Sequence, residues 1–169
     1  DGEVYDARLE NAPFDAFAEL ADAPKGALTE RLSPPLRVVD HVAPRELIHT
    51  PKGEWVIDFG QEMTGWVEFN CDLPEGARAF LQFGELLQND CFYNENLRSA
   101  KAEYTFISAG KKAHVRPHFT FYGFRFMKVE GIENIQLSDF DGCVIHSDIP
   151  VIGEFTTSNA KVNRLIQNA

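Results

Sequence analysis

The stretch that decides the fold is "WVIDFGQEMTGWVEFN", residues 55–70. Apolar and polar residues alternate on both sides of Gly60, which is the pattern of β-strands that bury one face. Gly60 and the polar residues after it predict a turn, so we expect two strands joined as a hairpin. In the first strand Trp55 shares a face with Ile57 and Phe59, and this face is expected to be buried.

The same stretch contains two carboxylates, Asp58 and Glu62, between Trp55 and Trp66. Enzymes that invert glycosidic bonds use two carboxyls roughly 6.5–9.5 Å apart across a cleft, a spacing that two residues flanking a turn can meet by accident. A single hairpin does not form a cleft. We therefore expect Asp58 to order the turn through backbone N–H groups and Glu62 to be solvated, with no raised pKa for either acid.

The rest of the chain repeats the strand pattern. Short runs rich in β-branched and aromatic residues, separated by Gly, Pro, Asn and Asp, follow one another between residues 36 and 156. Only the end predicts a helix, with Ser158 as a good N-cap and Val162, Leu165 and Ile166 on one face. This order predicts an all-β fold, an antiparallel two-sheet β-sandwich or jelly roll with a short C-terminal helix.

Aromatic residues are expected to build the core of this sandwich. In "FRFMKV" Phe124 and Phe126 share one face of a strand, while Arg125 and Met127 take the other unless both faces are covered. The expected core members are Trp55, Phe59, Phe119, Phe124 and Phe126. Truncation of Trp55 to Ala would then cost about 3–5 kcal/mol.

Charge and motifs exclude several functions. The formal net charge is -10 and the Lys and Arg residues are scattered, which argues against nucleic acid and anionic membrane surfaces as partners. No phosphate loop, nucleophile elbow or calcium loop is present, so neither a cofactor nor a metal is expected. The histidines show no metal-ligand spacing, and the cysteines are expected to be small buried hydrophobes: Cys71, Cys91 and Cys143.

One segment is a candidate binding site. The loop "CFYNENLRSAKAEY", residues 91–104, is long, polar and rich in hydrogen-bonding side chains. Two readings stay open: the loop binds a sugar or docks a domain, or it orders itself through its own Asn side chains. Trp66 adds a second candidate, because its alternation with Glu68 and Asn70 points it away from the core. The candidate binding residues are Trp66, Tyr93, Asn94, Glu95, Asn96 and Arg98.

Six phrases, in this order, resemble bacterial α-L-rhamnosidases of the large multidomain type. They are "GEVYDARLE", "WVIDFGQEMTGWVEF", "YNENLRSAKAEYTF", "FTFYGFRFMKVEG", "HSDIP" followed by "IGEF", and "SNAKVNRLIQNA". The resemblance implies a concanavalin-like β-sandwich at 36–156. It also implies that residues 1–35 are the tail of a preceding N-terminal β-domain with its linker, and that 157–169 begin a linker helix toward a six-hairpin catalytic domain.

Members of that family remove terminal L-rhamnose from plant glycosides and polysaccharides with inversion. Their acidic catalytic motif, close to "DxxxRxExxGWxGD", has no counterpart in this chain, and the family favours Asn at the position of Glu62. No catalytic residue is therefore expected, and these residues alone should be inactive. The chain begins and ends in mid-phrase, which favours a segment of a longer bacterial protein and leaves its compartment open.

Three functions compete at this stage. The first is an accessory sandwich that docks the catalytic and N-terminal domains of the same protein. The second is a carbohydrate-binding module for rhamnose or a neighbouring sugar, with Trp66 or Tyr93 as an aromatic platform. The third, a complete small glycosidase, requires a cleft with two converging acids.

Overall fold

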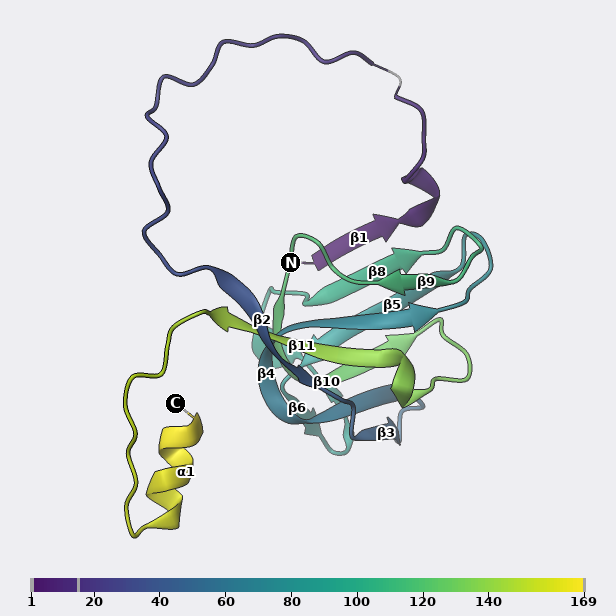
Figure 1. Ribbon diagram of the computed structural model, residues 1–169. Helices are drawn as coiled ribbons and strands as arrows, with labels where there is room; N and C mark the ends of the chain where they lie inside the picture. The colour runs from purple at the N-terminus through teal and green to yellow at the C-terminus, as the bar shows by residue number, and fades with distance from the viewer. Residues whose placement is uncertain (1, 15, 169) are drawn as a thin grey trace.

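The computed structural model describes residues 2–14 and 16–168 and shows a sandwich of β-strands with a short helix set apart at the C-terminus (Figure 1). The strands are β1 Gly2–Asp6, β2 Leu36–Val42, β3 Glu46–His49, β4 Trp55–Cys71, β5 Arg78–Gly84, β6 Leu86–Gln88, β7 Cys91–Tyr93, β8 Glu103–Ile107, β9 Ala113–Val115, β10 Tyr122–Glu130 and β11 Phe140–Ser147. The helices are α1 Ala160–Asn168 and the short 3₁₀ turns η1 Ala7–Leu9, η2 Glu95–Leu97 and η3 Leu137–Asp139.

Strand β4 belongs to both layers of the sandwich. In the first layer, residues 55–58 of β4 pair with β3 and β10, and the layer continues from β10 through β5 and β8 to β1. In the second layer, residues 65–71 of β4 pair with β11 and β9, and β11 in turn pairs with β2. The layers are thus one hydrogen-bonded sheet that turns back on itself through β4, and the described pairings of this sheet are antiparallel apart from β1–β8. The predicted two-layer antiparallel sandwich is confirmed.

The hairpin predicted at Gly60 is wrong, because β4 runs through this glycine as one strand of 17 residues. Gly60 has φ +78, a conformation that glycine adopts without strain. Opposite it, β10 pairs Phe124 with Met63 and Phe126 with Asp58, so four residues of β4 face one residue of β10. This irregular bulge of four residues against one bends the strand and lets one continuous segment pass from one layer to the other.

An ion pair holds the bend. Both oxygens of the buried Asp58 carboxylate accept from Arg125, the residue opposite the bulge, with Nε–Oδ1 and Nη2–Oδ2 distances of 2.8 Å. The backbone N–H of Gly60 donates to Asp58 Oδ1 at 2.6 Å, so the expected backbone role of this acid is confirmed. Hydrogen bonds from Arg125 keep the pKa of Asp58 below its usual value, against the opposing effect of burial.

The core lies between the layers and is largely aromatic. Phe69 of β4 packs edge-on against Phe106 of β8 with ring centroids 6.3 Å apart, which joins the two layers directly. Phe83 stacks on Tyr122 at 4.1 Å. A smaller cluster of Val56, Phe92 and Phe126 lies on the outer face of the first layer, where the β6–β7 hairpin covers it. The part of the first layer under this hairpin is therefore covered on both faces.

The prediction of core aromatics is confirmed for three residues and wrong for two. Phe59, Phe124 and Phe126 are buried, but Phe124 belongs to the main core and Phe126 to the outer cluster. The prediction that these two share a face is wrong, because the register shifts between them at the bulge. Met127 joins the main core instead.

Trp55 and Phe119 are not core residues. Trp55 is 43% exposed at the start of β4, where its ring packs on His49 with centroids 4.5 Å apart at the rim of the sandwich. Phe119 is 94% exposed because it precedes β10 in a bend rather than a strand. Strand alternation alone does not show where a core ends.

Two segments lie outside the sandwich: the stretch between η1 and β2, and the C-terminal stretch that contains α1. Between η1 and β2 the described residues form no helix or strand and follow a wide arc (Figure 1). In α1 the cap is Asn159 rather than Ser158, since Asn159 Oδ1 accepts from the backbone N–H groups of Lys161 and Val162 at 3.0 and 3.4 Å. None of the helices in the described part of the chain has the length and apolarity to cross a membrane.

Arg125→Met is expected to lower the free energy of unfolding by about 2–4 kcal/mol near neutral pH, because it leaves the Asp58 carboxylate buried without its cation. The depressed pKa of Asp58 sets the pH window. Stability from this pair is present above the unfolded pKa of about 4 and is lost as pH falls through the lower folded pKa. The gap between wild type and variant, measured by urea unfolding, should therefore narrow in acid.

Arg37→Met is the matched control, because Arg37 pairs with Asp148 at 3.3 Å with both side chains largely exposed. This change is expected to cost no more than about 0.5 kcal/mol at any pH. Equal losses in the two variants would contradict a special role for the pair at the bend.

Candidate functional site

The loop singled out in the sequence begins as a tight hairpin. β6 and β7 are joined by Asn89 and Asp90, whose φ angles of 52 and 58 are those of a two-residue type I′ turn. Tyr93 ends β7, half-buried and paired with Leu86. The hairpin carries Phe92 into the outer cluster, which anchors the start of the loop.

The polar residues that follow form the turn η2. The backbone N–H of Leu97 donates to the carbonyl of Asn94 at 3.1 Å, and that of Arg98 donates to the carbonyl of Glu95 at 3.1 Å. Arg98 then takes φ 56, which reverses the chain. The loop is thus ordered by its own backbone, while the side chain of Glu95 stays exposed.

A hollow of about 300 Å³ lies beside this turn. Asn96 Nδ2 donates to Glu85 Oε2 at 2.8 Å, which ties the loop to the end of β5 at the edge of the hollow. Phe121, 54% exposed, presents its ring there. The lining residues are Glu85, Leu97, Ala100, Ala102, Thr120, Phe121, Tyr122 and Gly123.

Trp66 lies elsewhere, on the half of β4 that pairs with β11. Its indole N–H donates to Glu68 Oε1 at 3.1 Å, and the other oxygen of Glu68 contacts His114 Nε2 at 2.8 Å. The ring is half-buried and its polar group already has a partner. The structure therefore gathers Tyr93, Asn94, Glu95, Asn96 and Arg98 around one loop and does not bring Trp66 to it.

Glu62 differs from the expectation of an ordinary acid. It is exposed, as predicted, but it stands on the bulge next to Gly123, where an added Cβ would lie 3.9 Å from Glu62 Oε1. Loss of hydration to the surrounding protein groups, followed by the negative charge of Glu85, raises the pKa of Glu62 to about 7, against the opposing charge of Arg125. No spacing in the sequence links the two acids, because their approach depends on β10 pairing with both β4 and β5.

The chemistry of this surface is that of a polar rim rather than a catalytic cleft. Glu85, in the bend after β5, lines the hollow, and Glu62 of β4 lies beside Gly123, another of the residues that line it. Inversion at a sugar carbon needs an acid and a base on opposite faces of the ring, whereas these acids lie along one surface. Such carboxylates can accept hydrogen bonds from hydroxyl groups. On the other layer, His41, Asp141 and Cys143 are the group of described side chains close enough to hold a metal ion.

Glu62→Gln is expected to raise the thermal midpoint at about pH 8 and to leave it nearly unchanged at about pH 4. The folded pKa of about 7 lies above the ordinary value of 4.5, so folding disfavours the ionised form. Wild-type stability is therefore lost as pH rises through this interval, and a neutral amide avoids the loss. The matched control is Glu95→Gln, which removes one negative charge from the neighbouring turn. A pH-independent difference would contradict the raised pKa.

Comparison with known proteins agrees with this architecture. The family described as bacterial alpha-L-rhamnosidase concanavalin-like domain matches residues 48–146. An alpha-L-rhamnosidase of Streptomyces avermitilis is 33% identical over 182 residues, covering 99% of this chain and 18% of the relative. One from Alteromonas sp. (strain LOR) is 30% identical over 182 residues, covering 99% of this chain and 20% of the relative.

Solved structures extend the likeness to three dimensions. The crystal structure of an alpha-L-rhamnosidase from Aspergillus terreus superposes with a TM-score of 0.87 and 29% identity, over 99% of this chain and 21% of that one. The chain spans about a fifth of the length of the curated relatives it matches. The family match covers the bend of β4, the loop and the hollow. The chain therefore belongs to the bacterial alpha-L-rhamnosidase concanavalin-like domain family.

Proposed function

We propose that this chain is a non-catalytic β-sandwich domain of a longer α-L-rhamnosidase, and that its role is to dock and stabilise the other domains. The support is that the relatives carry the name alpha-L-rhamnosidase and are about five times as long. The longer protein would hydrolyse terminal α-L-rhamnose from plant glycosides or polysaccharides. Its catalytic acids would lie in a six-hairpin domain beyond these residues.

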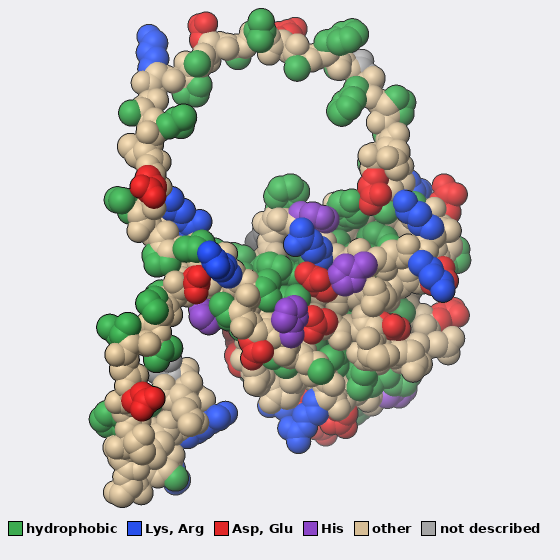
Figure 2. All heavy atoms as spheres, viewed as in Figure 1, with side chains coloured by type: hydrophobic (Ala, Val, Ile, Leu, Met, Phe, Trp, Pro, Cys, Tyr) green, Lys and Arg blue, Asp and Glu red, His purple; other side chains and the backbone are tan. Residues whose placement is uncertain are grey.

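The observation that carries the docking role is the exposure of apolar side chains in the two flanking segments. Phe14 and Phe17 are both 100% exposed, and their neighbours on the arc are similar. Figure 2 shows hydrophobic side chains strung along this arc and along the segment leading to the helix. The largely exposed members are Phe14, Phe17, Leu20, Leu28, Leu32, Val151, Ile152 and Phe155.

Soluble proteins rarely leave so many large apolar groups in water without a partner surface. We assign residues 1–35 to the tail of a preceding N-terminal β-domain with its linker, 36–156 to the sandwich and 157–169 to the start of a linker helix. Strand β1 nevertheless pairs with β8, so the first segment is bound to the sandwich at one end. The neighbouring domains would cover the remainder of both segments.

The surroundings of Asp58 and Glu62 support a non-catalytic role for the sandwich. Asp58 is neutralised by Arg125 and held by the Gly60 N–H, so it is not free to transfer a proton. Glu62, with a pKa raised to about 7, lines a different hollow beside β11, and no second acid is among the described residues that line it. An exposed ring, Phe121, beside the Glu85 carboxylate favours sugar binding at the hollow as a second candidate function.

The 169-residue chain is expected to release no nitrophenol from an aryl α-L-rhamnoside above the enzyme-free rate. Turnover that disappears in Glu62→Gln or Glu85→Gln would contradict this and identify the substituted acid as catalytic. Calorimetric titration with L-rhamnose separates binding from turnover. Binding that is lost in Phe121→Ala or Tyr93→Ala, while turnover is absent, would support the sugar-binding candidate instead of docking alone.

Docking itself predicts an effect that depends on the rest of the protein. Phe17→Asp is expected to lower the thermal midpoint of the full-length enzyme and to leave that of the 169-residue chain unchanged, because Phe17 is fully exposed in the latter. Asp22→Ala, on the same arc, is the control for a polar position. An unchanged midpoint in the full-length enzyme for Phe17→Asp, Leu20→Asp and Ile152→Asp alike would overturn the docking role.

A further inference from the structure

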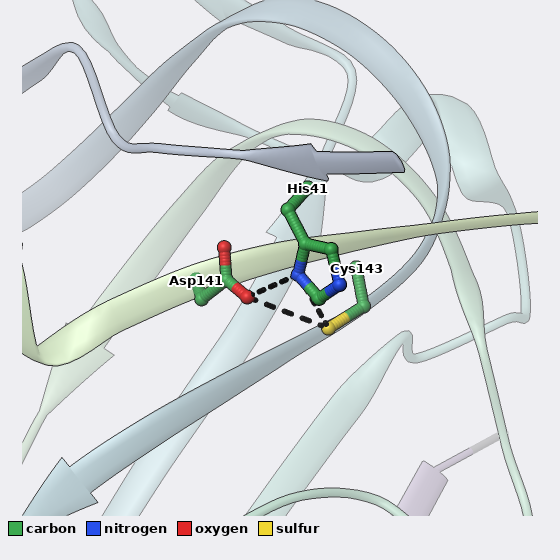
Figure 3. A group of neighbouring side chains, drawn as sticks. All are labelled: His41, Asp141 and Cys143. Carbon is green, nitrogen blue, oxygen red and sulfur yellow. Dashed lines mark hydrogen bonds and ion pairs between the residues drawn. The ribbon is translucent and has the colours of Figure 1, made fainter. Parts of the chain in front are cut away.

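Three side chains of types that commonly bind metals meet on the outer face of the second layer (Figure 3). Cys143 of β11 pairs directly with His41 of β2, and Asp141 lies two residues before it on the same face. Asp141 Oδ2 contacts His41 Nδ1 at 2.5 Å. Cys143 Sγ lies 3.9 Å from His41 Nδ1 and 3.8 Å from Asp141 Oδ2.

From these contacts we propose that His41 Nδ1, Asp141 Oδ2 and Cys143 Sγ bind a divalent transition metal of the zinc class. Imidazole, carboxylate and thiolate are the ligands that zinc takes in proteins, with bonds of about 2.0–2.3 Å. Tetrahedral bonds of this length place ligand atoms roughly 3.5 Å apart. The two distances to sulfur are already close to this value. Only the His41–Asp141 contact must open for the ion to enter.

The surroundings permit this opening. The side chains of His41 and Asp141 are 61% and 42% exposed, so both can rotate outward. Cys143 is 1% exposed and fixed by the sheet, which makes it the rigid base of the site. Water would complete a tetrahedral ion, because both oxygens of the nearby Glu68 are already engaged by Trp66 and His114.

Electrostatics also favour a cation here. Burial, followed by the charges of Glu68 and Asp141, raises the pKa of Cys143 to about 12, so the thiol stays protonated without a metal. The hydrogen bond with Asp141, followed by the charge of Asp141, raises the pKa of His41, with smaller contributions from Glu68 and Asp40. A dication would neutralise this excess of negative charge and release the thiol proton to solvent.

Such a site would stabilise a weak part of the fold. β2 is an exposed edge strand whose only strand partner among the described residues is β11. Its register with β11 shifts between Val144 and Ile145, next to the proposed site. A metal bound by one ligand from β2 and two from β11 would join the edge strand to the sheet through its side chains. This role does not depend on the docking function.

The test uses the reduced, metal-free 169-residue chain titrated with Co²⁺ and then with Zn²⁺. One equivalent of Co²⁺ is expected to give a thiolate-to-cobalt charge-transfer band with intense tetrahedral ligand-field bands. Zn²⁺ should abolish both and raise the thermal midpoint. His41→Ala, an exposed change that spares the core, should weaken binding by more than about tenfold, since loss of even an outer partner of a ligand can cost that much.

His146→Ala, an exposed change on β11, and Cys71→Ser are matched controls from the same layer, and both are expected to bind as wild type. Cys143→Ser should remove the charge-transfer band. If that variant does not fold, Asp141→Asn with His41→Ala decides the question. Cobalt binding without a thiolate band, or equal affinity in His41→Ala and wild type, would overturn the proposal.

Discussion

The Asp58–Arg125 ion pair is the contact on which the arrangement of the two layers depends. A strand that leaves one layer and enters the other must bend, and its backbone groups at the bend lose their partners in the sheet. Here the buried carboxylate gives the Gly60 N–H a partner, and the guanidinium of the opposite strand neutralises and orients that carboxylate. β3 pairs with β4 before this bend, β11 and β9 pair with it after the bend, and β10 pairs with it on both sides.

The bulge beside this ion pair also explains why two acids approach each other near the hollow. Because β4 bulges by several residues opposite Arg125, Glu62 is carried toward Gly123 and the end of β5, where Glu85 follows. The same bulge shifts the phase of β10, so that Phe126 anchors the β6–β7 hairpin on the outside while Phe124 packs inside. One irregularity in pairing thus shapes the core, the loop and the acidic rim together.

Local pattern was enough to predict the sandwich, since strand alternation and turn residues are properties of neighbours in sequence. It failed at Gly60 because the alternation is intact on both sides of the bulge, and a glycine with positive φ suits a turn and a bulge equally. It failed for Trp55 and Phe119 because the extent of a core is a tertiary property. The raised pKa of Glu62 and the cluster of His41 with Cys143 depend on partners brought together only by strand pairing, so no spacing rule could find them.

The parallel pairing of β1 with β8 has a consequence for association between molecules. In the sheet order β1 and β2 lie at opposite ends, and the arc between them carries the chain from one edge to the other. β1 pairs with the backbone groups of β8 that would otherwise be free. An unpaired β8 would offer a template for strand addition by a second copy. A shortened chain starting at β2 would lose β1 and, with it, the core residue Ala7 and the packing of Tyr5 on the core. The first segment thus contributes to the stability of the domain and also protects the edge of β8 from association.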